Sequence, residues 1–159
     1  MKQKIIIGNW KNYLGHKESI SLAHLLQELS GKDKTRVMVS PNHLYLNEVN
    51  QILSTTNIEV ISQNLTSAES KSDTGGITLK NLKEININRS LVAHSETRIR
   101  EKNPQSILLE IIPIGFPFVL CFEEISQIPF DILNDDFEII LAYEPVSVSY
   151  THLTLPTKA

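Results

Sequence analysis

Six short runs of apolar, mostly β-branched residues recur along the chain and alternate with polar or amphipathic stretches. Runs of this length with few polar residues are typical of strands that are buried on both faces of a parallel sheet. Each is too short to favour a buried helix instead. The runs cover residues 5–7, 37–39, 58–61, 90–93, 117–121 and 137–142.

The segments between these runs carry helical signals. Residues 18–30 place Ile20, Ala23, Leu26 and Leu29 three residues apart, which predicts an amphipathic helix that ends before the next glycine. Shorter helices are predicted at residues 44–53 and 79–85, with weaker patterns after residues 100 and 123. Regular alternation of strand and helix predicts the α/β class with a parallel sheet.

Composition fits one soluble domain and argues against several classes of function. The chain has 159 residues, of which 41% are hydrophobic and 21% charged, and its formal net charge is −3 with scattered basic residues. A basic stripe for nucleic acid or an anionic membrane is therefore not expected. Cys121 is the only cysteine, which excludes an internal disulfide framework and favours a reducing compartment.

Targeting and cofactor motifs are also missing. The start MKQKIIIGNW has only three consecutive apolar residues, too few for a signal peptide or a membrane span, so we expect a cytoplasmic protein. No glycine-rich phosphate loop follows any predicted strand, which argues against dinucleotide and P-loop nucleotide binding. The histidines show no spacing of metal ligands, so neither a metal nor another cofactor is expected.

Polar and ionisable residues follow several of the predicted strands at their carboxyl ends. In parallel α/β folds these ends lie on one side of the sheet, where ligands bind. We therefore expect side chains from separate strands to meet in one pocket. They are Asn9 and Lys11 after the first strand, Gln63 and Asn64 after the third, His94 and Glu96 after the fourth, and Glu144 after the sixth.

An ordered set of short motifs on these strand ends resembles the triosephosphate isomerase family over about residues 4–146. The resemblance implies a (β/α)8 barrel of the TIM type, here an incomplete barrel with about six parallel strands. It also implies interconversion of dihydroxyacetone phosphate and glyceraldehyde 3-phosphate through an enediolate, in glycolysis and gluconeogenesis. The motifs are Gly8-Asn9-Trp10-Lys11, Ser62-Gln63-Asn64, Thr74-Gly75, Ala93-His94-Ser95-Glu96, Leu120-Cys121 with Glu124, and Ala142-Tyr143-Glu144-Pro145-Val146.

The resemblance also implies roles for individual residues. Glu144 would be the general base that moves a proton between adjacent carbons, and His94 would polarise the carbonyl as a neutral imidazole. Lys11 would add positive charge near the phosphate and the enediolate, with Asn9 orienting either the substrate or the lysine. Ser95 and Glu96 would be supporting residues, the glutamate by pairing with the lysine.

Residue type alone favours plainer roles for the same positions. A glutamate before proline is most often a solvent-facing strand end, a lone histidine is most often structural, and a lysine is usually a solvated surface charge. Cys121 is predicted to pack as a small buried side chain and Trp10 to be structural. Only the combination of motifs favours catalysis for Glu144 and His94.

A Ser-rich loop at residues 65–78 reads by composition as a flexible connection. In the family this loop enters a neighbouring subunit, which implies a homodimer with Thr74 and Gly75 at the interface. Gly76 departs from the pattern, because the family usually has an acidic residue there.

The last residues depart further from the family. Residues 147–159 read SVSYTHLTLPTKA, where the family continues into a glycine-rich lid and two more strands. We expect a partial barrel domain at residues 1–146 and an unrelated, artefactual tail at 147–159. Such a truncated chain is predicted to fold poorly and to have little or no activity alone.

The sequence leaves two alternatives to an enzyme that resembles triosephosphate isomerase. The chain could be a non-catalytic binder of phosphorylated ligands, or an assembly fragment that needs another chain to close its barrel. It could also be an unrelated isomerase built on a parallel α/β barrel. Turnover that disappears in a Glu144→Gln variant would favour the enzyme, and a substrate screen would separate the unrelated isomerase.

Overall fold

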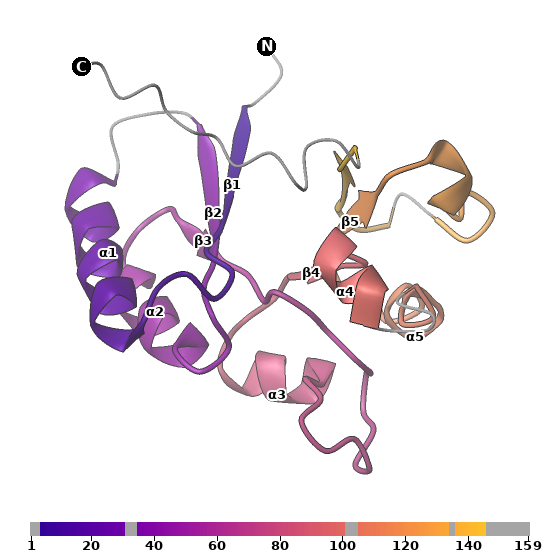
Figure 1. Cartoon of the computed structure of the whole chain (residues 1–159), viewed down its shortest axis with the longest axis horizontal. Coiled ribbons are helices and arrows are strands. Elements are labelled where there is room, and N and C mark those ends of the chain that lie inside the picture. Colours follow the sequence, from indigo (N-terminus) through magenta and orange to yellow (C-terminus); the bar gives the residue numbers. More distant parts are fainter. Residues whose placement is uncertain (1–3, 31–34, 101–104, 134–135, 146–159) are drawn as a thin grey trace.

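The computed structural model describes residues 4–30, 35–100, 105–133 and 136–145. Six strands run through these residues, and every pairing between them is parallel (Figure 1). They agree with the six predicted apolar runs to within about two residues at most ends. The strands are β1 (Ile5–Asn9), β2 (Arg36–Ser40), β3 (Glu59–Val60), β4 (Ser90–Val92), β5 (Phe118–Phe122) and β6 (Ile139–Tyr143).

The strands form two sheets of three, in the orders β1-β2-β3 and β4-β5-β6. An isolated parallel bridge between Ser62 and Ser90 joins the end of β3 to β4. There the Ser62 amide donates to the Arg89 carbonyl at 3.0 Å, and the Leu91 amide donates to the Ser62 carbonyl at 2.9 Å. The six strands therefore follow one another in chain order, as the incomplete barrel predicted from the sequence requires.

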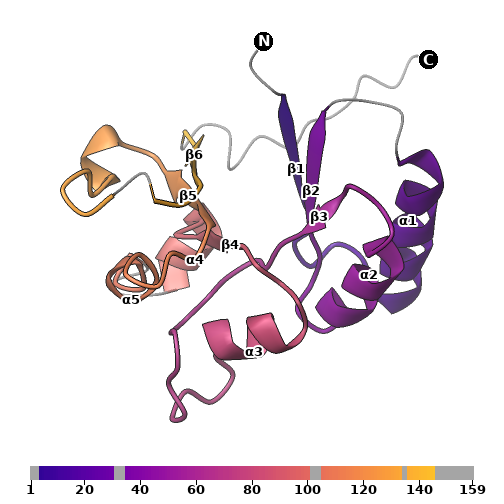
Figure 2. The same ribbon diagram turned by 180° about the vertical axis from the view of Figure 1, so that it is seen from behind.

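Helices cover the outside of the strands, and α1 and α2 lie together beside β1 to β3 (Figures 1 and 2). The three predicted helices are confirmed, although their ends are shifted. The first begins at His16, next to Gly15, whose amide donates to the Glu18 carboxylate at 2.9 Å. The helices are α1 (His16–Leu29), α2 (Leu46–Leu53), α3 (Leu79–Glu84), α4 (Ser95–Arg100) and α5 (Leu108–Ile111), with a 3-10 turn η1 (Ile125–Gln127).

Buried side chains form two clusters, one on each face of the strands. The larger lies between strands and helices and includes Leu53, Leu82 and Phe118. The smaller takes its members from the strands and lies on the inner side, as the core of a barrel does. Its buried members are Met38, Ile61, Leu91 and Val119, with Ile7, Ile140 and Ala142 packed against them.

Four charged residues close the amino-terminal end of this inner core. Each lies two residues before a member of the smaller cluster, so the alternation of strand side chains turns it to the same inner face. Their guanidinium nitrogens and carboxylate oxygens are 2.5–2.7 Å apart in four ion pairs. We call this group the basal ring: Arg36, Glu59, Arg89 and Glu138.

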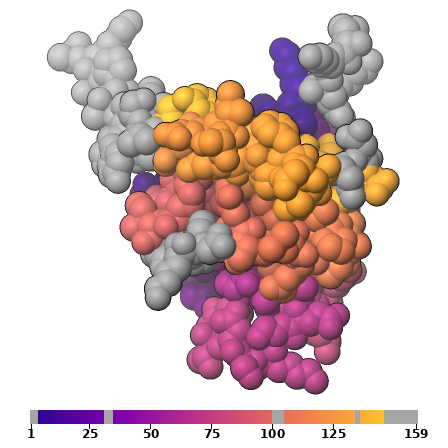
Figure 3. Space-filling model, turned by 90° about the vertical axis from the view of Figure 1, so that its right-hand side faces the viewer, coloured from indigo at the N-terminus to yellow at the C-terminus, as the bar shows by residue number. Residues whose placement is uncertain are grey.

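The loop between β3 and α3 stands out from the body of the protein, and the magenta segment that contains it forms one end of the space-filling view (Figure 3). Gly75, at its tip, has a φ of 84°, a conformation that glycine adopts without strain. A side chain at Gly76 would collide with the carboxylate of Asp73, which is hydrogen-bonded to Thr66.

No helix within the described ranges is long and apolar enough to cross a membrane. The expected tail at residues 147–159 lies outside the described residues.

Candidate active site

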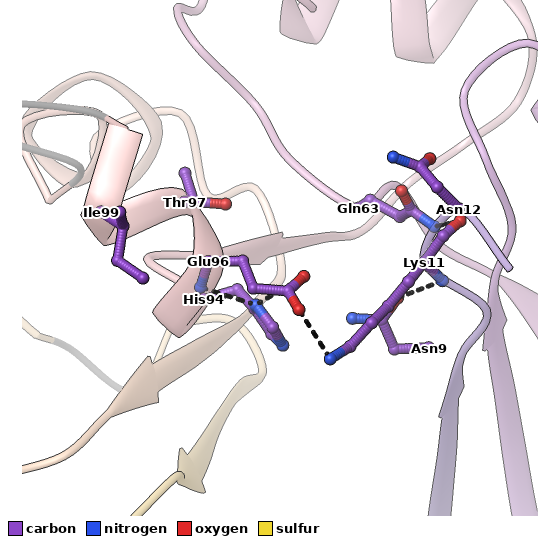
Figure 4. A pocket seen from close by; sticks show the side chains of 8 residues that line it. All are labelled: Asn9, Lys11, Asn12, Gln63, His94, Glu96, Thr97 and Ile99. Atoms are coloured by element: carbon purple, nitrogen blue, oxygen red, sulfur yellow. Dashed lines mark hydrogen bonds and ion pairs between the residues drawn. The ribbon is translucent and has the colours of Figure 1, made fainter. Parts of the chain in front are cut away.

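A cavity of about 370 Å³ opens at the carboxyl ends of the strands. Figure 4 shows that its walls come from both sheets: one wall from the ends of β1 and β3, the other from the start of α4. The expected convergence is found for Asn9, Lys11, Gln63, His94 and Glu96, whereas Asn64 and Glu144 do not line the cavity. The cavity is lined by Asn9, Lys11, Asn12, Gln63, His94, Glu96, Thr97 and Ile99.

Lys11 is held firmly at the mouth of β1. Its φ is 49°, a left-handed value that non-glycine residues adopt only where neighbours enforce it. Two side chains do so: its amide donates to Asn9 Oδ1 at 2.9 Å, and its carbonyl accepts from Gln63 Nε2 at 2.9 Å. Its Nζ is 2.8 Å from Glu96 Oε1, and this hydrogen bond is the main cause that raises the pKa of Lys11. The lysine therefore carries a fixed positive charge beside the cavity.

His94 lies between β4 and α4 with both ring nitrogens engaged. Nδ1 lies 3.2 Å from the Glu96 amide, and Nε2 lies 3.0 Å from Glu144 Oε1. Because a backbone N–H can only donate, Nδ1 must accept, and the ring proton sits on Nε2. Burial lowers the pKa of His94, although Glu144 acts in the opposite direction. Both observations favour a neutral imidazole that presents an N–H donor.

Glu144 follows β6 and reaches the site through His94. One carboxylate oxygen faces His94 Nε2, and the other accepts from the Ser95 amide at 2.9 Å. Its own amide donates to the Phe122 carbonyl at 2.7 Å, which extends the pairing of β5 and β6 by one residue. Glu144 is therefore next to His94 but is not itself a wall of the cavity.

Arg98 is a neighbour of this site that the sequence argument missed. One of its terminal nitrogens donates to the Cys121 carbonyl at 3.0 Å, and the other is 2.8 Å from Glu123 and 3.8 Å from Glu144. Cys121 itself is buried as predicted, and burial raises the pKa of its thiol. Arg98 thus ties α4 to the ends of β5 and β6 around Glu144.

Gln63 was expected in the pocket, and its side-chain amide donates to the Lys11 and Ser40 carbonyls. Three other lining residues were not expected. Asn12 lies one residue beyond the predicted motif, and Thr97 and Ile99 belong to α4, a helix that was not predicted. Their positions one to three residues from predicted site residues were the only available signal.

Thr74 and Gly75 lie elsewhere, exposed on the protruding loop. Their role at a subunit interface stays a prediction.

Comparison with known proteins identifies the family of this chain. The family model described as triosephosphate isomerase matches residues 4–154. The chain belongs to the triosephosphate isomerase family. The family's barrel accounts for the chain-order arrangement of the parallel strands and for a site at their carboxyl ends.

Individual relatives carry the same name. The triosephosphate isomerase of Mycoplasma pneumoniae is 25% identical over 92% of this chain and 66% of its own length. That of Clostridium acetobutylicum is 27% identical over 92% of this chain and 68% of its own length. That of Leptospira borgpetersenii is 37% identical over 62% of this chain and 40% of its own length. The chain thus spans about two thirds of the length of the first two relatives.

Proposed function

We propose that the protein interconverts dihydroxyacetone phosphate and glyceraldehyde 3-phosphate by proton transfer through an enediolate. The observation that carries this proposal is the contact of a neutral His94 with the Glu144 carboxylate at 3.0 Å, beside a cavity that contains the Lys11 cation. A base, a neutral hydrogen-bond donor and a cation are the three groups that such a reaction needs. Family membership supports the choice of substrate.

His94 and Glu144 differ in the chemistry that each side chain can perform. A carboxylate can remove the proton from one carbon of the substrate and return it to the next, so Glu144 is the proposed base. A neutral imidazole can donate Nε2–H to the carbonyl oxygen while negative charge develops there, so His94 is the proposed electrophile. Substrate entry would replace the present contact between the two side chains with one contact from each to the substrate.

Lys11 is proposed to bind the substrate phosphate and to stabilise the enediolate. Its charge is already fixed at the cavity, so little reorganisation is needed when charge develops. Asn9 and Gln63 hold its backbone, and Glu96 holds its head group. Ser95 supports the base through its amide.

The wider role follows from the same proposal. We propose a cytoplasmic enzyme of glycolysis and gluconeogenesis that works without a cofactor and forms a homodimer through the loop that carries Thr74 and Gly75. A polypeptide of residues 1–159 alone is expected to have little activity, because its described residues supply six strands of an eight-stranded design. The apolar side chains of Ile6 and Leu141, on the two outermost strands, are 58% and 44% exposed.

The test is turnover by the full-length protein and its Glu144→Gln variant. We expect isomerisation of both triose phosphates, and a fall in kcat of about 10²- to 10⁴-fold in the variant because the base is removed while the shape is kept. Residues 1–159 are assayed in parallel. A protein that binds the triose phosphates but turns over neither is a binder, and would contradict the proposal. A Glu144→Gln variant with unchanged kcat would move the base elsewhere.

A further inference from the structure

His43 is a partly buried hydrogen-bonding group that the proposed mechanism does not use. It lies in the connection between β2 and α2, outside the cavity lining, and its Nε2 is 2.8 Å from Ser62 Oγ. The Ser62 hydroxyl has one proton, which it donates to the Asn64 carbonyl at 2.7 Å. His43 must therefore be the donor in its contact with Ser62.

This direction of donation argues against a nucleophilic pair. A histidine that activates a serine accepts the hydroxyl proton, whereas here the proton points to a backbone carbonyl. Ser62 is also fully buried, so no substrate could reach its oxygen. Burial lowers the pKa of His43, in keeping with a neutral ring that acts as a fixed donor.

The contact instead fixes the chain at the end of β3. Ser62 is held by its backbone between Arg89 and Leu91 and by its side chain between His43 and Asn64. The next residue, Gln63, is thereby aimed into the cavity, where its side-chain amide reaches the Lys11 carbonyl at 2.9 Å and the Ser40 carbonyl at 3.1 Å.

Lys11 depends on that amide because its backbone is in the left-handed region. Such a conformation costs on the order of 1–3 kcal/mol and persists only where neighbouring groups determine it. If the end of β3 shifted, the Gln63 side chain would move with it and would no longer fix the Lys11 backbone. The position of the lysine head group would then change as well.

We propose that His43 is a positioning residue for Lys11 and that it acts through the end of β3. It touches no substrate; it holds Ser62, so that the adjoining glutamine can hold the lysine. This inference rests on the proposed function for its effect on substrate, whereas its structural part concerns only the protein's own hydrogen bonds.

The test compares His43→Leu with His43→Gln in the full-length protein. Leucine fills much of the space without a donor, whereas the side-chain amide of glutamine extends about as far as Nε2 and can donate. His24→Leu, at an exposed position of α1, is the matched control. The measurements are the NMR resonances of the Lys11 backbone amide and the Gln63 side-chain amide, and the dissociation constant of glycerol 3-phosphate, a probe that cannot isomerise.

We expect His43→Leu to shift both resonances and to weaken the binding of glycerol 3-phosphate about two- to tenfold, the usual range for one lost hydrogen bond. His43→Gln should restore most of both, and His24→Leu should change neither. Ser62→Ala removes the same link from its other side and decides the question if His43→Leu does not fold.

Resonances of Lys11 and Gln63 that stay at their wild-type positions in folded His43→Leu or Ser62→Ala protein would overturn the inference. A wild-type protein that binds no glycerol 3-phosphate would instead count against the proposed function. In that case the resonances alone still decide whether His43 positions the lysine.

Discussion

Charged side chains gather at both ends of the strands, but their partners differ between the two ends. At the amino-terminal end, each arginine of the basal ring pairs with both glutamates, and the Arg89 side chain is only 5% exposed. At the carboxyl end, Lys11 has one carboxylate partner, Glu96, and its head group borders a cavity of about 370 Å³. Charges satisfied within the protein stabilise it, whereas charges next to open space can act on a ligand.

The backbone shows the same contrast. Arg36 and Glu138 lie on or beside regular strand, whereas Lys11 has a strained backbone at the mouth of its strand. Strain of this kind persists where neighbouring groups enforce it, and it is common at active sites. Substitutions at the carboxyl end should therefore lower activity, whereas substitutions at the amino-terminal end should lower stability.

The largest expected effect is at the carboxyl end. Lys11→Met keeps the apolar stem and removes the charge, so we expect kcat/KM to fall by about 10²- to 10³-fold, as for loss of one group that stabilises developing negative charge. The midpoint of urea unfolding should move little. The check is steady-state kinetics beside urea unfolding of the full-length protein, and a large loss of stability with unchanged kcat/KM would erase the contrast between the ends.

The second effect is at the amino-terminal end and concerns stability. Glu138→Ala leaves Arg89 with one carboxylate partner, Glu59, and we expect it to lower the free energy of unfolding by about 1–3 kcal/mol, with the lower part favoured because the Glu138 side chain is 43% exposed. Urea unfolding measures the loss. Turnover at saturating substrate should stay within about twofold of wild type, and a larger fall would mean that the ring reaches the active site.

Acid should weaken the basal ring. The hydrogen bond from Arg36 is the main cause that lowers the pKa of Glu138 from its ordinary value of 4.5. The folded state therefore binds this proton less readily than the unfolded state, so the stabilisation is complete above pH 4.5 and is lost as the pH falls below it. Unfolding free energies measured from pH 6 to pH 3 should fall less steeply in Glu138→Gln than in wild type. Equal slopes would contradict the assignment.

The smallest expected effect is at an exposed pair of side chains, and it gives a reference for the larger loss of stability. His16 Nε2 lies 2.7 Å from Glu48 Oε2 between α1 and α2, with side chains 56% and 50% exposed. An exposed pair of this kind contributes about 0–1 kcal/mol, so Glu48→Gln should change the unfolding free energy by less than the Glu138 variant does. If Glu48→Gln and Glu138→Ala lower the unfolding free energy equally, the burial of Arg89 does not explain the contribution of the basal ring to stability.

The sequence predicted the strands well because each is a short apolar run whose type needs no long-range information. It also predicted that Asn9, Lys11 and His94 would meet, because parallel strands bring their carboxyl ends to one side. The convergence of Glu144 with His94 follows from the same rule. Their catalytic roles rest on family resemblance and stay proposals.

The parts that were missed depend on contacts between distant segments. Arg36 and Glu138 are 102 residues apart, and nothing in either local pattern indicates the other. The helix α4 is short, and its sequence SETRIR has no apolar repeat to signal it. Leu44 was expected to start the second helix, but that helix begins at Leu46 and Leu44 is left 82% exposed in the preceding turn.

Between β3 and β4 the described backbone pairing narrows to one bridge, Ser62 with Ser90, although both buried clusters take side chains from the two sheets. Hydrogen exchange should therefore be faster at the amides of this bridge than inside either sheet of three strands. Among the described residues, ion pairs join the two sheets on either side of this bridge: Arg36 with Glu138 and Arg89 with Glu59 at the amino-terminal end, and Lys11 with Glu96 at the other. The end with fewer ion pairs between the sheets is the one that contains the cavity. Transient separation of the two sheets would therefore admit solvent there first.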